Sequence, residues 1–155
     1  MPATADDIKY LKVAISEARV GLSEGGVPIG ACVVDGSGKL LGVGHNKRVQ
    51  ENSAIKHGET DCMENIGRLP ASVYKTCTMY TTLSPCDMCS GTILLYGIPR
   101  VVMGENHTFK GNEDYLRSRG VEVINLDDAE CKQIMADFIK EKPELWNEDI
   151  GVENP

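Results

Sequence analysis

The feature that most constrains the fold of this chain is a regular alternation of short apolar runs with longer segments of helical periodicity. From Ile8 to Leu22 apolar residues recur at steps of three and four, which predicts an amphipathic helix. The runs IGACVVD (29–35) and LLGVGHN (40–46) flank a Gly-Ser-Gly turn and predict a β-hairpin. After a polar loop, further helices are predicted over 57–68, 86–96, 113–119 and 128–140, with strands over 76–83, 100–104 and 121–126 between them.

Strands separated by helices predict an α/β fold, a three-layer α/β/α sandwich around a central five-stranded sheet. The second half should contain parallel crossovers, and the hairpin makes the sheet mixed. A chain of 155 residues can bury one core, so we expect a single domain over 1–155. Asp127 is predicted to be the N-cap of the last helix, with Glu130 completing a capping box. We expect the segment after Pro143, ELWNEDIGVENP, to be a short tail.

Charge and composition narrow the classes of partner. The chain has 16 basic and 23 acidic residues, a net charge of −7, and such a surface repels phosphate backbones. The opening MPATADDIKY lacks the apolar stretch of a signal peptide, and no uncharged apolar run is long enough to span a bilayer. We therefore expect a soluble cytoplasmic protein without a nucleic-acid or membrane partner, small enough to enter the nucleus.

Two motifs carry the chemistry: His57-Gly58-Glu59 and Pro85-Cys86-Asp87-Met88-Cys89, each placed where a loop or strand enters a helix. Positions i and i+3 of a helix share a face, so the two thiols of the second motif point to one place. The amides of a first helical turn favour the thiolate that a metal needs. Two thiolates and one imidazole suit Zn²⁺, and we predict His57, Cys86 and Cys89 as its ligands. The other four cysteines are expected in the core.

Three protein ligands leave a coordination position for water, whose pKa zinc lowers from about 15.7 to about 7. Glu59 is then the candidate base, provided that it and His57 converge at an irregular helix start. The order H-x-E…P-C-x-x-C is the signature of zinc deaminases. One alternative stays open: a structural zinc module whose fourth ligand is His45, His107 or another cysteine, with the acidic tail binding a partner.

With these motifs, the chain from about Ile8 to Gly151 resembles the fungal cytosine deaminases of the cytidine deaminase-like superfamily. The stretches that carry the resemblance are EGGVPIGACVV, GHN, HGE, YTTLSPCDMC, YGIPRVVMGEN and LWNEDIG. The resemblance implies zinc-dependent hydrolysis of free cytosine to uracil and ammonia in pyrimidine salvage. Glu59 would carry protons to ring N3 and then to the leaving amino group.

The resemblance also implies that Asn46 and Asp149 hydrogen-bond the pyrimidine edge and that Phe109 and Trp146 close over the ring. Without it, Asn46 would be a turn residue, Asp149 solvated, and both aromatic side chains packed in the core. The family forms homodimers, and the apolar segment SGTILLYG (90–97) would suit an interface or the chain's own core. Rival substrates in the superfamily are guanine, a nucleoside and adenosine in tRNA; the net charge counts against the last.

Overall fold

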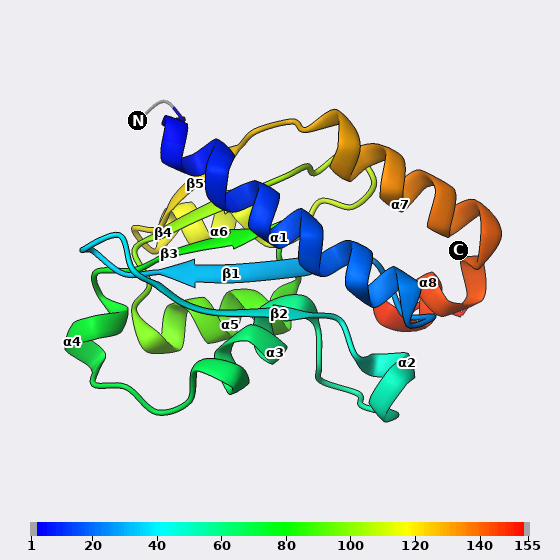
Figure 1. Ribbon diagram of the computed structural model, residues 1–155, viewed down its shortest axis with the longest axis horizontal. Coiled ribbons are helices and arrows are strands. Elements are labelled where there is room, and N and C mark those ends of the chain that lie inside the picture. Colours follow the sequence, from blue (N-terminus) through cyan, green and yellow to red (C-terminus); the bar gives the residue numbers. More distant parts are fainter. Residues whose placement is uncertain (1–2, 154–155) are drawn as a thin grey trace.

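The computed structural model describes residues 3–153, and a five-stranded sheet of order β2-β1-β3-β4-β5 forms its centre (Figure 1). The strands are β1 (Gly30–Val34), β2 (Leu40–His45), β3 (Thr78–Thr81), β4 (Arg100–Met103) and β5 (Glu122–Asn125). Strand β1 pairs antiparallel with both β2 and β3, whereas β3, β4 and β5 run parallel. The predicted hairpin, mixed sheet and parallel second half are confirmed. The outermost residues of the predicted domain, 1–2 and 154–155, lie outside the described part.

Helices cover both faces of the sheet. Helices α1 (Ala5–Ser23) and α7 (Ala129–Glu141) lie on one side; α3 (Gly58–Ile66), α5 (Asp87–Tyr96) and α6 (Glu113–Ser118) lie on the other (Figure 1). Strand β1 shows why both faces are apolar. Ala31 and Val33 pack into the core under α3 and α5, while Cys32 and Val34 pack into the core under α1. This alternation with a period of two confirms the three-layer architecture.

Three short helices were not predicted: α2 (Arg48–Glu51), α4 (Ala71–Tyr74) and α8 (Pro143–Asp149). The last one corrects the expectation of a short tail. Pro143 occupies the first helical turn, where its missing N–H costs nothing, so it begins a helix as well as ending α7. Helix α8 brings Trp146 and Asp149 back onto the body of the protein, where both are buried.

The predicted cap of the last long helix is off by one residue. Asp128 is the N-cap of α7, and its side chain accepts a hydrogen bond from the Cys131 N–H at 2.8 Å. Asp127 instead has a left-handed backbone with φ 49°. Glu130 forms an ion pair with Arg19 of α1 at 2.6 Å, so it does not complete a capping box. Two adjacent aspartates offered the same capping chemistry, and the chain path selected the second.

Helix α1 is anchored at its N-terminal end by Asp7, a buried carboxylate. It completes a capping box with Thr4 and forms two hydrogen bonds with the Arg100 guanidinium, at 2.7 and 2.8 Å. The Tyr80 hydroxyl donates a third at 3.0 Å. Hydrogen bonding to Arg100 is the main reason why the pKa of Asp7 falls to about 2. The helix thus begins one turn before Ile8 and is tied to β3 and β4.

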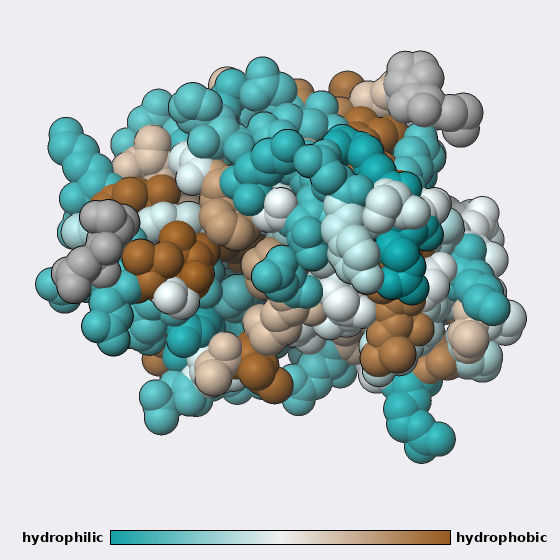
Figure 2. Space-filling view, turned by 180° about the vertical axis from the view of Figure 1, so that it is seen from behind, coloured by the Kyte–Doolittle hydropathy of each residue, from teal (hydrophilic) through white to brown (hydrophobic). Residues whose placement is uncertain are grey.

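Figure 2 shows the face of the molecule that is hidden in Figure 1. This face is mostly hydrophilic, with hydrophobic side chains in separate small patches. Among residues 3–153, no helix combines the length and the apolar character needed to cross a bilayer. The four cysteines expected in the core are buried and unpaired: Cys32, Cys62, Cys77 and Cys131. Of the large hydrophobic residues that remain exposed, Leu95 and Tyr96 are neighbours near the end of α5.

Candidate active site

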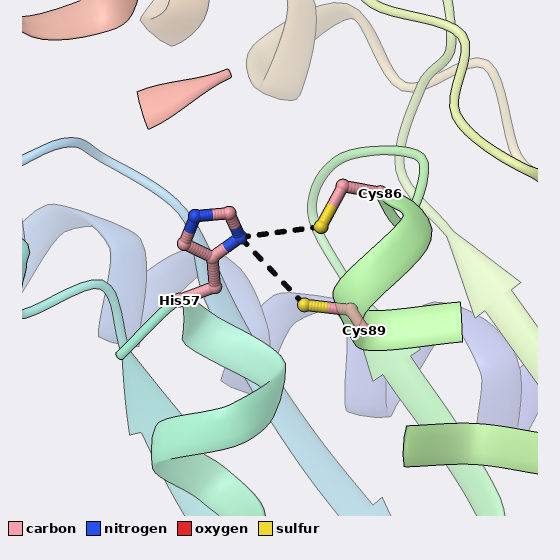
Figure 3. A group of neighbouring side chains, drawn as sticks. All are labelled: His57, Cys86 and Cys89. Atoms are coloured by element: carbon pink, nitrogen blue, oxygen red, sulfur yellow. Dashed lines mark hydrogen bonds between the residues drawn. The ribbon is translucent and has the colours of Figure 1, made fainter. Parts of the chain in front are cut away.

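His57, Cys86 and Cys89 converge at one point (Figure 3). The His57 Nδ1 atom lies 3.4 Å from the Cys86 sulfur and 3.7 Å from the Cys89 sulfur, and all three ligand atoms lie within 4.8 Å of one another. A tetrahedral zinc with bonds of about 2.0 Å to nitrogen and 2.3 Å to sulfur places N and S about 3.5 Å apart. Within residues 3–153, this donor set is the group with metal-ligand spacing, and its dimensions fit zinc.

Helix starts produce this convergence. His57 is the N-cap of α3 and Cys86 is the N-cap of α5, both with extended backbone, and Cys89 follows Cys86 by nearly one turn. The Cys86 thiol receives hydrogen bonds from Cys89 and His57, which lower its pKa to about 4. It is therefore a thiolate at neutral pH, the form in which cysteine binds a metal. Cys89 is fully buried whereas Cys86 is partly exposed, so solvent reaches this group at Cys86.

The second nitrogen of His57 faces Asp149. The Nε2 atom lies 3.5 Å from Asp149 Oδ1, and the Asn46 side-chain amide donates to the same oxygen at 2.6 Å. Asn46 Oδ1 in turn accepts the Arg48 N–H at 3.1 Å, which fixes the orientation of its amide. A carboxyl group on the remote nitrogen of a ligating histidine orients the ring. Asn46, Asp149 and His57 thus form one chain of contacts, with burial raising the pKa of Asp149.

Glu59 and His57 line the same cavity, although they are two residues apart. They converge because His57 is the cap residue and still has extended backbone, whereas Glu59 is already helical. Glu59 is 3% exposed, and this burial raises the pKa of its carboxyl group to about 7. A carboxyl group with that pKa exchanges protons readily at neutral pH. The structure therefore places an acid–base group beside His57, Cys86 and Cys89.

The two histidines considered as a fourth ligand lie outside the metal-binding group of residues 3–153. The two ring nitrogens of His45 face carboxylates of Glu17 at 3.0 Å and Glu24 at 2.7 Å. His107 lies in the loop that follows β4, where its N–H donates to Glu105. The geometry thus favours three protein ligands and an open coordination position over a closed structural site.

The cavity beside this group is small, with a volume of about 20 Å³. Phe109 and Trp146 form one wall as an edge-to-face pair, with ring centroids 6.0 Å apart and an interplanar angle of 84°. Asp149 lines the cavity directly. Asn46 is fully buried behind it and reaches the cavity through Asp149.

Sequence reasoning missed four further residues of the lining: Ile29, Leu83, Ser84 and Ile150. Leu83 and Ser84 directly precede the Pro-Cys motif, so their place at the site follows from their neighbours. Ile29 and Ile150 carry no such signal, since an apolar residue next to a strand or in a short helix is common in any core.

The sheet explains why residues distant in sequence meet here. His45 pairs with Gly30, Ala31 with Thr81, and Thr81 with Met103, so the ends of β2, β3 and β4 and the start of β1 lie along one edge. The segments that carry the site follow or precede these strand ends. Ligands of open α/β sheets bind at the carboxyl ends of the strands, where the strand order reverses.

Comparisons with known proteins agree with this geometry. Residues 4–105 match the model of the cytidine and deoxycytidylate deaminase zinc-binding region. A cytosine deaminase of Candida albicans is 60% identical over 148 residues, covering 96% of this chain and 99% of that protein. A tRNA-specific adenosine deaminase of Streptococcus pyogenes is 32% identical over 153 residues, covering 91% of this chain and 95% of the relative.

Among solved structures, a guanine deaminase from Nitrosomonas europaea superimposes with a TM-score of 0.69 at 21% identity, covering 89% of this chain and 86% of that one. This similarity supports the fold. The match to the family model, which spans the His-Gly-Glu and Pro-Cys-x-x-Cys motifs, and the identity with the curated relatives establish the family. The chain therefore belongs to the zinc-binding cytidine and deoxycytidylate deaminase family.

Proposed function

We propose that the chain catalyses the zinc-dependent hydrolytic deamination of free cytosine to uracil and ammonia. The observation that carries this proposal is that Glu59, His57 and Cys86 line one small cavity with Cys89 beside it. The 60% identity with the Candida albicans cytosine deaminase, over nearly the full length of both chains, supports cytosine as the substrate.

His57 Nδ1 and the sulfurs of Cys86 and Cys89 would hold the zinc. When bound, zinc lowers the pKa of a coordinated water from about 15.7 to about 7 and so supplies a nucleophile at neutral pH. The thiolate state of Cys86 prepares this donor set for the metal. Asp149, 3.5 Å from Nε2, would keep the imidazole turned so that Nδ1 faces the two sulfurs.

Glu59 would move both protons of the reaction. It accepts one from the attacking water and delivers it to ring N3 as the oxygen adds to C4. It then takes the proton of the hydroxyl added to C4 and gives it to the amino group; the C4–N bond breaks, the C4=O bond of uracil forms, and ammonia leaves. A carboxyl group with a pKa of about 7 can accept and release a proton at each step with little energetic cost.

Four residues would bind the base. Asp149 and Asn46, joined by their 2.6 Å hydrogen bond, would contact the polar edge of the pyrimidine. Phe109 and Trp146 would close over the ring and exclude water, which strengthens the electrostatic interactions inside. The cavity is narrow, which favours neither a ribose nor a larger chain attached to the base.

In the cell, the proposed reaction belongs to pyrimidine salvage, and we infer a single-domain cytoplasmic enzyme small enough to enter the nucleus. We further propose a homodimer. Leu95, 75% exposed, and Tyr96, 42% exposed, lie next to each other on α5 and line a groove together with residues of α3 and α4. A second copy covering this surface would remove both side chains from water.

Related deaminases are the rival activities, because a tRNA-specific adenosine deaminase and a guanine deaminase share the fold. The net charge of −7 counts against RNA, which is bound by basic surfaces. The test is to incubate the zinc-loaded protein with cytosine, cytidine, guanine, adenine and a tRNA anticodon stem, and to measure ammonia. Release from cytosine alone supports the proposal; release from none of these substrates leaves only the structural zinc module.

A variant pair tests the proton carrier. Glu59→Gln keeps the size of the side chain and removes its acid-base function, so we expect full zinc content with turnover reduced at least about a hundredfold. Glu64→Gln is the matched control, since Glu64 lies on the same helix but is exposed. Near-normal turnover of Glu59→Gln would show that another group moves the protons.

A further inference from the structure

The loop between β4 and α6, residues 104–112, holds Phe109 at the wall of the cavity. Its first part contains Glu105, which is fully buried and takes no part in the proposed chemistry. Burying a carboxyl group is unfavourable unless its oxygens are hydrogen-bonded. The partners of this side chain therefore indicate what it does for the site.

Within residues 3–153, the hydrogen-bond partners of the Glu105 side chain all lie in the two residues before Phe109. One oxygen accepts the backbone N–H groups of His107 at 2.8 Å and Thr108 at 2.9 Å. The other accepts the Thr108 hydroxyl. The backbone carbonyl of Glu105 accepts the N–H of Ser84 at 2.9 Å, at the segment that leads to the metal-binding cysteines. One buried residue thus links the backbone ahead of Phe109 to the strand end that carries the ligands.

The far end of the loop is fixed separately. The Ser84 hydroxyl donates to buried Glu113 at 2.6 Å and accepts the Gly111 N–H at 2.8 Å. A side chain at Gly111 would place its Cβ only 1.9 Å from the Pro85 carbonyl oxygen, so the backbone is held directly against the cysteine motif. Phe109 lies between these two attachments. The hydrogen bonds of Glu105 are the nearer attachment, because they hold Thr108, the residue directly before Phe109.

We propose that Glu105 is a positioning residue for substrate binding. It holds Phe109 against Trp146 at the cavity wall, where the Phe109 ring can cover the base. The inference rests on the proposed function, because it assigns the ring of Phe109 to the base. It makes Glu105 a determinant of affinity for the ring although it does not touch the substrate. Since Phe109 would contact the base before and during the reaction, its displacement should raise KM and leave kcat nearly unchanged.

Glu105→Ala removes both oxygens and leaves the N–H groups of His107 and Thr108 without their acceptor. An aromatic contact is worth about 0.5–1.5 kcal/mol, and each 1.4 kcal/mol is a factor of ten, so we expect KM for cytosine to rise about twofold to tenfold. We expect kcat to stay within about twofold.

Glu105→Gln is the conservative variant. Its amide oxygen can accept the two backbone N–H groups, and its NH₂ can donate to the Thr108 hydroxyl, which then accepts. We expect this variant to restore most of the wild-type KM. Thr108→Val removes only the hydroxyl contact and keeps the shape of the side chain, so it provides a milder perturbation if Glu105→Ala folds poorly.

Trp146 provides a readout that does not depend on activity. It is the only tryptophan in the chain, and it is 6% exposed with its ring against Phe109. A displaced Phe109 should shift Trp146 emission to longer wavelength and increase its quenching by acrylamide. Asp7→Asn is the control, since it weakens the anchor of α1 away from the cavity and should change neither KM nor emission.

Raised KM and red-shifted emission in Glu105→Ala, both reversed in Glu105→Gln, would support the inference. Wild-type KM and emission in folded Glu105→Ala and Thr108→Val would overturn it, as would equal changes in Asp7→Asn. If the wild-type protein releases no ammonia from cytosine, the proposed function fails. The emission of the variants then still decides whether Glu105 positions Phe109 against Trp146.

Discussion

The anchor formed by Asp7 and Arg100 leads to a quantitative prediction about stability and pH. Asp7 has a pKa of about 2 in the fold, against an ordinary value of 3.8. One pKa unit corresponds to about 1.4 kcal/mol, so ionised Asp7 stabilises the folded chain by about 2.5 kcal/mol relative to its protonated form. Replacement by asparagine keeps the volume and removes the charge, and should cost about that amount at pH 7.

The direction of the pH dependence follows from the lowered pKa. A carboxyl group with a depressed folded-state pKa contributes its full stabilisation above the unfolded value and loses it as the pH falls through the folded value. The difference between wild type and Asp7→Asn should therefore be about 2.5 kcal/mol at pH 7, about 2 at pH 4 and about 1.3 at pH 3, by the linkage relation. It should approach zero below pH 2.

Urea unfolding of the two proteins, followed by circular dichroism at each pH, measures this difference. Both proteins lose other acid-sensitive interactions alike, including metal binding, so their difference isolates Asp7. Glu130→Gln is a matched control, because its ion pair with Arg19 also joins α1 to a neighbour but is about half exposed on both sides. That variant should lose less than about 1 kcal/mol. A difference for Asp7→Asn that stays constant between pH 7 and pH 3 would refute the electrostatic explanation.

Three further predictions concern the metal, the aromatic wall and the dimer. Cys89→Ser should reduce zinc content well below one per chain by elemental analysis, while Cys77→Ser, the same change in a buried cysteine outside the site, should retain it. Trp146→Ala should lower the free energy of unfolding by about 3–5 kcal/mol and raise KM for cytosine, with Trp146→Phe recovering part of both. Leu95→Glu should give a monomer by light scattering, whereas Leu22→Glu on exposed α1 should not; a dimer in both would place the interface elsewhere.

The parts of the fold that were predictable share a strong local signal. The hairpin of β1 and β2 has two apolar runs around a glycine turn, and α1 has a long amphipathic repeat. His57 and Cys86 were placed at helix starts because their motifs follow loop or strand signals, and the structure has each of them as an N-cap. In these segments, local preference and tertiary packing require the same conformation.

Helix α8 is a segment whose local sequence does not predict its conformation. Its sequence, PELWNED, begins with a proline and carries three acidic residues in seven, a pattern equally typical of a solvated tail. What makes it a helix is the burial of Trp146 against Met135 and Phe138 and the hydrogen bond between Asp149 and Asn46. Of these partners, Asn46 is 103 residues away in sequence, and a helix this short has little stability of its own. Only the family resemblance indicated that Trp146 and Asp149 belong to the site.

The site also depends on tertiary contacts that no motif encodes. The three side chains come from two helix starts, and those starts lie together because the preceding strands, β2 and β3, both pair antiparallel with β1 and so end at the same end of the sheet. The start of α5 directs the Cys89 N–H and the positive end of its helix dipole toward the Cys86 sulfur, which favours negative charge there. The two sequence motifs supply the three candidate ligand side chains, and the pairing of the strands brings the two motifs together. The short helix α8 and the loop held by Glu105 then line the cavity beside these side chains.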